Sequence, residues 1–224
     1  MPTHCSQEEM DFGTSGGRKL VGAFDGGAIT SNGGVVLLAA ADKRIGLSER
    51  LAACFRDYRN ASLVTYETVD LLRQRIFGLG LGHEDLIDHD ALRFDPALMA
   101  ALNRPEDALA GKSTLNRLEH AGKIGLDRHH KLDHDPSAIE RLFVDVFIDA
   151  HEEPPIRIVL DLDATDDRLF GFQEGRHYHG YYDCYCYLPL YIFCGRHLLA
   201  AKLRSSSVDG AHGAKDEVAR IVAQ

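Results

Sequence analysis

The chain has 224 residues, a formal net charge of −9 and 45% hydrophobic residues, so it is long enough to bury one large core or two small ones. The N-terminus has no apolar run typical of a secretory signal, and no apolar span reaches the ~18 residues that a membrane helix needs. We therefore expect a cytoplasmic protein with no membrane partner. The five cysteines are an odd number without a framework spacing, which argues against a disulfide scaffold.

The first part of the chain is predicted to be mainly helical. Residues 1–17 are polar and rich in glycine, which is typical of a disordered leader. Residues 18–152 begin with a short strand at 19–27 and continue with segments whose apolar residues lie three and four positions apart. These predicted helices are 30–46, 48–59, 65–80, 83–93, 95–102, 112–121 and 136–151.

The pattern changes at residue 153, after Pro154 and Pro155 exclude a continuing helix. Strands are predicted at 156–164, 182–195 and 197–206, and the glycine turn between the last two indicates a hairpin. A helix at 209–224 follows. Three strands and then a helix without a C-cap are typical of an incomplete domain, so we expect an α+β or α/β fold in which 153–224 is truncated.

Four carboxylates come directly after an apolar run in "IRIVLDLDATDD" at 156–167. Side chains alternate along a strand, so Asp161 and Asp163 should lie on one face about 7 Å apart, with Leu160 and Leu162 on the other. Two like charges repel unless a cation neutralises them, and Mg²⁺ is held by one or two carboxylates. The alternative is a solvated strand end, where Asp166 and Asp167 turn the chain.

Two enzyme classes place aspartates in such a setting. "DLDAT" matches the signature of haloacid-dehalogenase-type phosphatases, with Asp161 as the nucleophile and Asp163 as the acid/base. In RNase H-like nucleases and transposases, the first strand presents an acid that holds Mg²⁺. The phosphatase needs several further β-α units of about 30 residues each, whereas three antiparallel strands and then a helix are the RNase H-like order. The order of elements therefore favours the second class.

Basic residues suggest contacts with nucleic acid, although the net charge is negative. The segment 112–131 is locally basic, and the N-terminus of its helix would favour phosphate. The alternative is an ordinary solvated surface. The candidate DNA contacts are Lys112, Ser113, Asn116, Arg117, Arg168, Arg176, Lys202 and Arg204.

Cysteine, histidine and tyrosine side chains are concentrated at 177–186. Cys184, Cys186, His177 and His179 suggest a zinc site, but their spacing lacks a CxxC pattern, and we favour buried structural thiols. Tyr178, Tyr181 and Tyr182 either offer faces to DNA bases or belong to the core.

Nearly the whole chain resembles bacterial insertion-sequence transposases of the DDE class, in DDE transposase group 1. Three segments carry the resemblance: "SNGGVVLLAAADKRIGLSERLA", "DALRFDPALMAALNRPEDALAGKSTLNRLEH" and "IVLDLDATDDRLFGFQEGRHYHGYYDCYCYLPLYIFCGRHLLAAKLR". The resemblance implies an RNase H-like catalytic domain at 153–224 whose three acids bind two Mg²⁺ ions. These ions promote DNA cleavage at the element's end and then attack of the freed 3′-hydroxyl on a phosphodiester of the target DNA.

The resemblance also implies roles for individual residues and partners. The first acid falls at Asp163, with Asp161 as the second choice, and the DNA partners are terminal inverted repeats and target DNA. A homo-oligomer is implied for the intact enzyme. The family's second acid lies on a strand after the final helix, and the third lies further on, so Asp209, Asp216 and Glu217 are poor substitutes.

We therefore expect an N-terminal fragment of a transposase that is inactive alone. The alternative is a non-enzymatic DNA-binding remnant that occupies element ends without cutting them.

Overall fold

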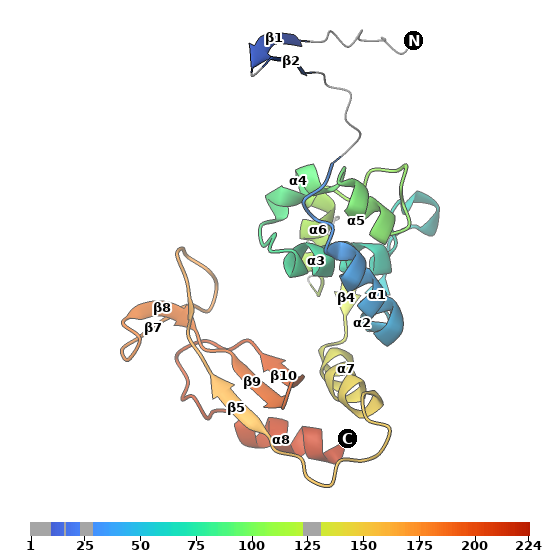
Figure 1. Cartoon of the computed structure of the whole chain (residues 1–224). Coiled ribbons are helices and arrows are strands. Elements are labelled where there is room, and N and C mark those ends of the chain that lie inside the picture. Colours follow the sequence, from blue (N-terminus) through green and yellow to red (C-terminus); the bar gives the residue numbers. More distant parts are fainter. Residues whose placement is uncertain (1–9, 16, 23–28, 123–130) are drawn as a thin grey trace. The chain divides into compact units, whose positions relative to one another are not determined.

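The computed structural model describes residues 10–15, 17–22, 29–122 and 131–224. Contacts divide the chain into two compact units, Met1–Asp42 with Arg73–Asn116, and Lys43–Leu72 with Arg117–Gln224. Figure 1 shows the order of the elements along the chain. The boundary expected between residues 152 and 153 falls inside the second unit. None of the described helices has the length and apolar character needed to cross a membrane.

The first unit contains an N-terminal hairpin of two antiparallel strands, β1 (Met10–Ser15) and β2 (Arg18–Gly22). Residues 10–15 belong to the segment for which a disordered leader was expected, whereas residues 1–9 and 16 lie outside the described residues. The difference has a local cause. The two strands satisfy each other's backbone groups, and Lys19 pairs with Asp11 at 3.2 Å across the hairpin.

The remainder of the first unit is helical, as the apolar spacing predicts. Its helices are α1 (Val35–Ile45), α3 (Thr68–Gly80), η2 (Leu86–Asp88), α4 (His89–Leu92), α5 (Pro96–Ala101) and α6 (Lys112–Glu119), of which α1, α3 and α6 run across the division between the units. Their apolar faces meet in one core of Val35, Phe77, Leu92, Leu98, Leu102 and Leu109. Asp95 caps α5, because its side chain accepts a hydrogen bond from the Leu98 N–H at 2.9 Å.

The second unit mixes helices with short antiparallel sheets. Its elements are α2 (Leu47–Ala52), β3 (Phe55–Asp57), η1 (Ala61–Leu63), β4 (Leu132–His134), α7 (Pro136–Asp149), β5 (Asp161–Ala164), β6 (Asp167–Arg168), β7 (His177–His179), β8 (Cys184–Tyr187), β9 (Leu190–Cys194), β10 (His197–Lys202) and α8 (Ala214–Ala223). The observed mixture of helices and small antiparallel sheets agrees with the expected α+β class.

Three sequence predictions need correction in this unit. The helix predicted at 48–59 ends at Ala52, because 55–57 form β3 and pair with β4. The strand predicted at 182–195 is two strands in different sheets, since Pro189 between them has no N–H to donate. The strand predicted at 156–164 is confirmed only at 161–164.

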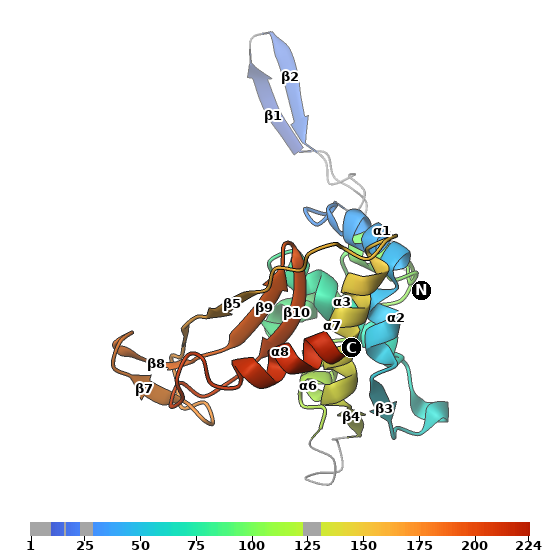
Figure 2. The ribbon, with the colours of Figure 1, turned by 90° about the horizontal axis from the view of Figure 1, so that it is seen from below.

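The main sheet has the order β10-β9-β5, with both pairs antiparallel. The hairpin predicted from the glycine turn is confirmed as β9–β10. Its apolar face meets α7 and α8, which lie alongside β9 and β10 in Figure 2. The buried core of this unit consists of Val144, Phe147, Leu190, Ile192, Leu199, Ala200 and Ile221.

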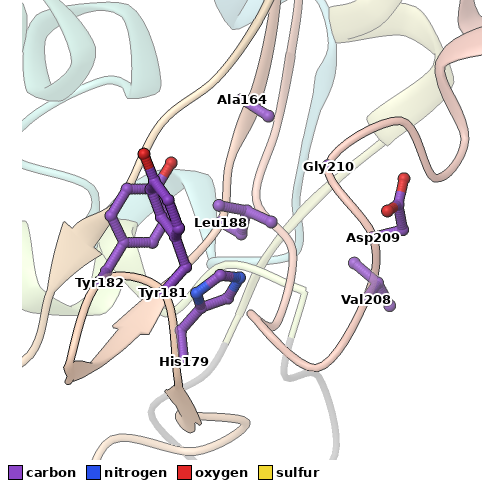
Figure 3. A pocket seen from close by; sticks show the side chains of 8 residues that line it. All are labelled: Ala164, His179, Tyr181, Tyr182, Leu188, Val208, Asp209 and Gly210. Carbon is purple, nitrogen blue, oxygen red and sulfur yellow. The ribbon is translucent and has the colours of Figure 1, made fainter.

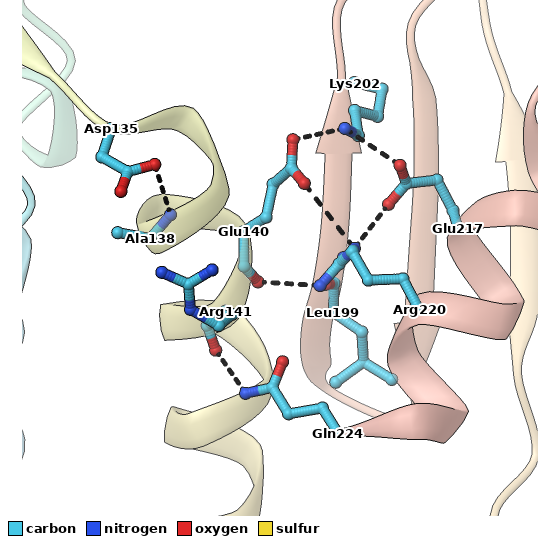
Figure 4. Close-up of polar contacts among 9 residues, drawn as sticks. All are labelled: Asp135, Ala138, Glu140, Arg141, Leu199, Lys202, Glu217, Arg220 and Gln224. Atoms are coloured by element: carbon cyan, nitrogen blue, oxygen red, sulfur yellow. Dashed lines mark hydrogen bonds and ion pairs between the residues drawn. The ribbon is translucent and has the colours of Figure 1, made fainter.

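Charged side chains also connect β10, α7 and α8 beside this core (Figure 4). Lys202 of β10 pairs with Glu140 of α7 and, at 2.9 Å, with Glu217 of α8. Arg220 of α8 lies 3.0 Å from Glu217 and 3.7 Å from Glu140. Burial by itself would raise the pKa of the Glu217 carboxyl, but the hydrogen bonds from Lys202 and Arg220 outweigh it and hold the pKa below its ordinary value of 4.5. The network therefore favours ionised Glu217 in the folded state.

This network predicts an acid-sensitive part of the stability. A carboxyl whose pKa is lowered by folding stabilises the protein above its unfolded pKa, and that contribution disappears as the pH falls through the lowered folded value. We expect Glu217→Gln to lower the free energy of unfolding by about 1–2 kcal/mol at neutral pH. The difference from wild type should shrink below pH 4.5. Urea unfolding of both proteins at several pH values measures this difference in the free energy of unfolding.

The matched control is Asp216→Asn, which removes the same charge from an exposed neighbour on α8. It should cost less at neutral pH than Glu217→Gln. Equal losses for both variants at every pH would contradict a specific role for the network.

Candidate functional site

Asp161 and Asp163 lie on β5, the edge strand of the main sheet. Asp161 is opposite Phe193 and Asp163 is opposite Tyr191 on β9. Both carboxylates are exposed, and neither has a hydrogen bond or ion pair with another described residue. They are therefore accessible to an external cation.

The register places these carboxylates on the open face of the sheet. Leu162 is opposite Ile192, which is fully buried against the helices, so Leu162 lies on the same face as Ile192 and is itself 43% exposed at the sheet edge. Asp161 and Asp163 alternate with Leu162 and share the other face, as the sequence predicts. β5 is an edge strand that pairs with β9 in an antiparallel sheet, whereas the phosphatase is built from consecutive β-α units. The position of the aspartates therefore gives no support to the phosphatase interpretation.

A pocket of about 240 Å³ lies where β5 ends (Figure 3). Ala164, the residue after Asp163, lines one side of it. The rings of His179, Tyr181 and Tyr182 form another side, with Leu188 among them in the view. The complete lining is Ala164, His179, Tyr181, Tyr182, Leu188, Val208, Asp209 and Gly210.

Arg204 holds the loop that forms the last wall of this pocket. Its Nε donates to the Leu188 carbonyl at 2.8 Å, and its terminal nitrogens donate to the carbonyls of Gly210 and His212. Lys202 is likewise engaged, with Glu140 and Glu217. The structure therefore places these two predicted DNA contacts in internal interactions.

Arg168 belongs to β6 of the three-stranded sheet β6-β8-β7, and Arg176 lies just before β7. This sheet lies between β5 and β9 in the sequence. Arg168 is exposed and lies 3.4 Å from Asp166. The Arg176 guanidinium donates to the Gly171 carbonyl and lies over the rings of Phe172 and Tyr185, at 4.3 Å and 4.5 Å from their centroids. Arg168 is therefore the more accessible of the two cations.

The other predicted DNA contacts share one exposed face of α6. Lys112, Ser113, Asn116 and Arg117 are all exposed, whereas Leu115 on the other side is fully buried. The Lys112 ammonium pairs with Asp90 at 2.8 Å, and the hydrogen bond from Lys112 holds the pKa of the Asp90 carboxyl below its ordinary value. The structure therefore brings these four residues together on one helix.

The start of α6 is fixed by a buried polar contact in the first unit. The Gln74 amide donates to the Ala110 carbonyl at 2.8 Å and accepts from the Ala110 N–H at 3.0 Å. Its nitrogen also lies 3.2 Å from Nδ1 of His89. These contacts hold the chain just before Lys112.

Cys184 and Cys186 occupy β8, with Cys186 fully buried. Burial raises the pKa of the Cys184 thiol, and the neighbouring Cys186 raises it further.

Among the described residues, no three or more His, Cys, Asp or Glu side chains gather as metal ligands. The two aspartates of β5 therefore offer a divalent ion one or two carboxylates, the number by which Mg²⁺ is usually held.

Sequence reasoning singled out His179, Tyr181 and Tyr182 but missed their association with Val208, Asp209 and Gly210. No local pattern relates these two segments. An isolated bridge between Tyr187 and Ser205, and the hydrogen bond from Ser206 Oγ to the His177 carbonyl at 2.8 Å, bring them together.

No curated protein and no solved structure matches the chain. The model of the family described as "Transposase DDE domain group 1" matches residues 12–224, which is nearly the entire chain and includes β5 and the pocket. The chain therefore belongs to this family of DDE-class transposases.

Proposed function

We propose that this chain is the part of a DNA transposase that binds element DNA and presents the first metal-binding carboxylate of an RNase H-like site. Asp163 is the proposed ligand, and Asp161 is the second choice. One observation carries the proposal: two exposed carboxylates without partners among the described residues share the open face of an edge strand. An aspartate that was buried or paired with a basic residue could not contact a cation and a DNA phosphodiester at the same time, whereas these two can.

A divalent ion, Mg²⁺ in the proposal, would supply charge stabilisation for in-line phosphoryl transfer when bound. The role of the chain's own residues is to hold that ion at a fixed point. β9 sets the position of Asp163 through the pairing with Tyr191, and the buried Ile192 next to it fixes the register. The remaining acids implied by the family are not gathered around Asp163 in the part of the chain that the structure describes.

DNA binding without cleavage is the second candidate function. The exposed face of α6 favours it, because Lys112, Ser113, Asn116 and Arg117 form a polar surface on one rigid helix. Such a face can contact phosphates whether or not a metal is bound at β5.

The metal site is tested by paramagnetic broadening of NMR signals with Mn²⁺. We expect sub-stoichiometric Mn²⁺ to broaden the signals of residues 161–165 first. Asp163→Asn should abolish this selective broadening, because it removes the proposed ligand, and Asp161→Asn should only weaken it, because Asp163 then remains. Asp107→Asn, at an exposed site in the first unit, is the control and should change nothing. Broadening that survives Asp163→Asn would exclude Asp163 as the ligand.

The expected lack of cleavage is tested separately. A supercoiled plasmid incubated with the 224-residue chain and Mg²⁺ or Mn²⁺ should remain intact, because two carboxylates on one strand do not complete a two-metal site. Gel electrophoresis measures nicking. Nicking by wild type that disappears in Asp163→Asn would show that the chain is active alone.

The α6 surface is tested by the salt dependence of DNA binding. If Arg117 contacts a phosphate, Arg117→Glu should weaken binding to generic duplex DNA by roughly tenfold and reduce the salt slope by about one. Fluorescence anisotropy at several salt concentrations measures both quantities. Arg44→Glu makes the same charge change at an exposed site on α1. Equal effects of the two substitutions would indicate only a general response to net charge.

A further inference from the structure

We propose that the pocket at the end of β5 binds one unpaired nucleobase of the DNA substrate, a role that rests on the proposed transposase function. The pocket has a volume of about 240 Å³, below the range of about 300–1,000 Å³ typical of sites for drug-sized ligands. It is therefore suited to a small ring system.

The lining determines the chemistry of the occupant. The rings of Tyr182 and His179 lie 4.8 Å apart, and those of Tyr182 and Tyr181 lie 5.0 Å apart and nearly perpendicular. Tyr181 is 85% exposed, so it presents an aromatic face that the protein itself leaves uncovered. Exposed aromatic faces stack on bases of any sequence.

The charge of the lining excludes a phosphate as the occupant. The pocket is lined by no Lys or Arg, and its one charged residue is Asp209. The Asp209 carboxylate accepts a hydrogen bond from the Ala211 N–H at 2.8 Å. A flat, uncharged ring therefore fits the lining better than an anionic group.

The position of the pocket relates it to the proposed reaction. Ala164 is next to Asp163, but successive side chains on a strand point to opposite faces. The pocket and the carboxylate therefore lie on the two sides of one strand end. A nucleotide whose base occupied the pocket would bring its own phosphate to that end. Such a base must leave the helical stack, at a cost of a few kcal/mol that is lowest for a base already unpaired.

The walls of the pocket are held in place before any ligand binds. The Tyr181–Tyr182 turn ends at Asp183, which has a positive φ of 52° and accepts a hydrogen bond from the Tyr178 hydroxyl. This hydrogen bond raises the pKa of Tyr178 and so favours its donating form. Arg204 holds the opposite loop at the Gly210 and His212 carbonyls. The site is therefore largely preformed.

The test compares two synthetic duplexes of identical sequence, one fully paired and one with a single extra, unpaired 2-aminopurine. Fluorescence anisotropy measures affinity, and 2-aminopurine fluorescence reports stacking on an aromatic ring. We expect wild type to bind the duplex with the unpaired base at least about fivefold more tightly than the paired duplex. Its 2-aminopurine signal should be quenched on binding.

Tyr181→Ala should abolish the preference and the quenching while leaving the affinity for the paired duplex unchanged. Tyr181→Phe keeps the ring and should behave as wild type. Tyr58→Ala removes another exposed tyrosine outside the pocket and should also keep the preference. Circular dichroism checks that each variant is folded.

Equal affinity of wild type for the two duplexes would overturn the pocket proposal while leaving DNA binding intact. A preference that survives Tyr181→Ala would also overturn it. Absence of binding to either duplex would overturn the proposed function together with the pocket.

Discussion

Burial of one face of the β9–β10 hairpin beneath α7 and α8 is the constraint on which the second unit depends. Ile192 and Leu199 are fully buried there, and Phe147 of α7 and Ile221 of α8 belong to the same core. Because side chains alternate along a strand, a shift of β5 by one residue against β9 would move its aspartates to the face on which Leu160 packs against the core. Carboxylates beside an apolar core are unfavourable, so that register is disfavoured. The apolar core therefore determines where Asp161 and Asp163 point.

Local signals predicted much of this structure, and contacts between distant segments account for the failures. α5 and α7 were predictable because Asp95 and Asp135 cap them and proline occupies the first turn of each. The open-face position of Asp161 and Asp163 followed from simple alternation. β3 was missed because it exists through pairing with β4, far along the chain. The wall of the pocket at Gly210 was missed for the same reason, since sequence alone does not indicate that it contacts Ala164.

The small sheet β6-β8-β7 is formed by the chain that connects β5 to β9. Its ladder does not include the strands of the main sheet, and it contributes His179 of β7 and the aromatic turn after β7 to the pocket. The buried cluster of α7, β9, β10 and α8 contains no residue of β6, β7 or β8, although Cys186 of β8 is itself fully buried. The scaffold that positions the carboxylates and the segment that supplies the rings are therefore structurally separate. Sequence changes in the connecting segment can alter the pocket with little effect on the buried core.

The edge position of β5 has a consequence for self-association. Among the described strands, β9 pairs with one side of β5, and no strand pairs with the other. A row of backbone N–H and C=O groups on such an edge invites another molecule to add a strand, and inward or alternating charges are a common defence. Two copies joined edge to edge through β5 would crowd four aspartate carboxylates together. The negative charges at 161 and 163 thus discourage aggregation at this edge of the sheet.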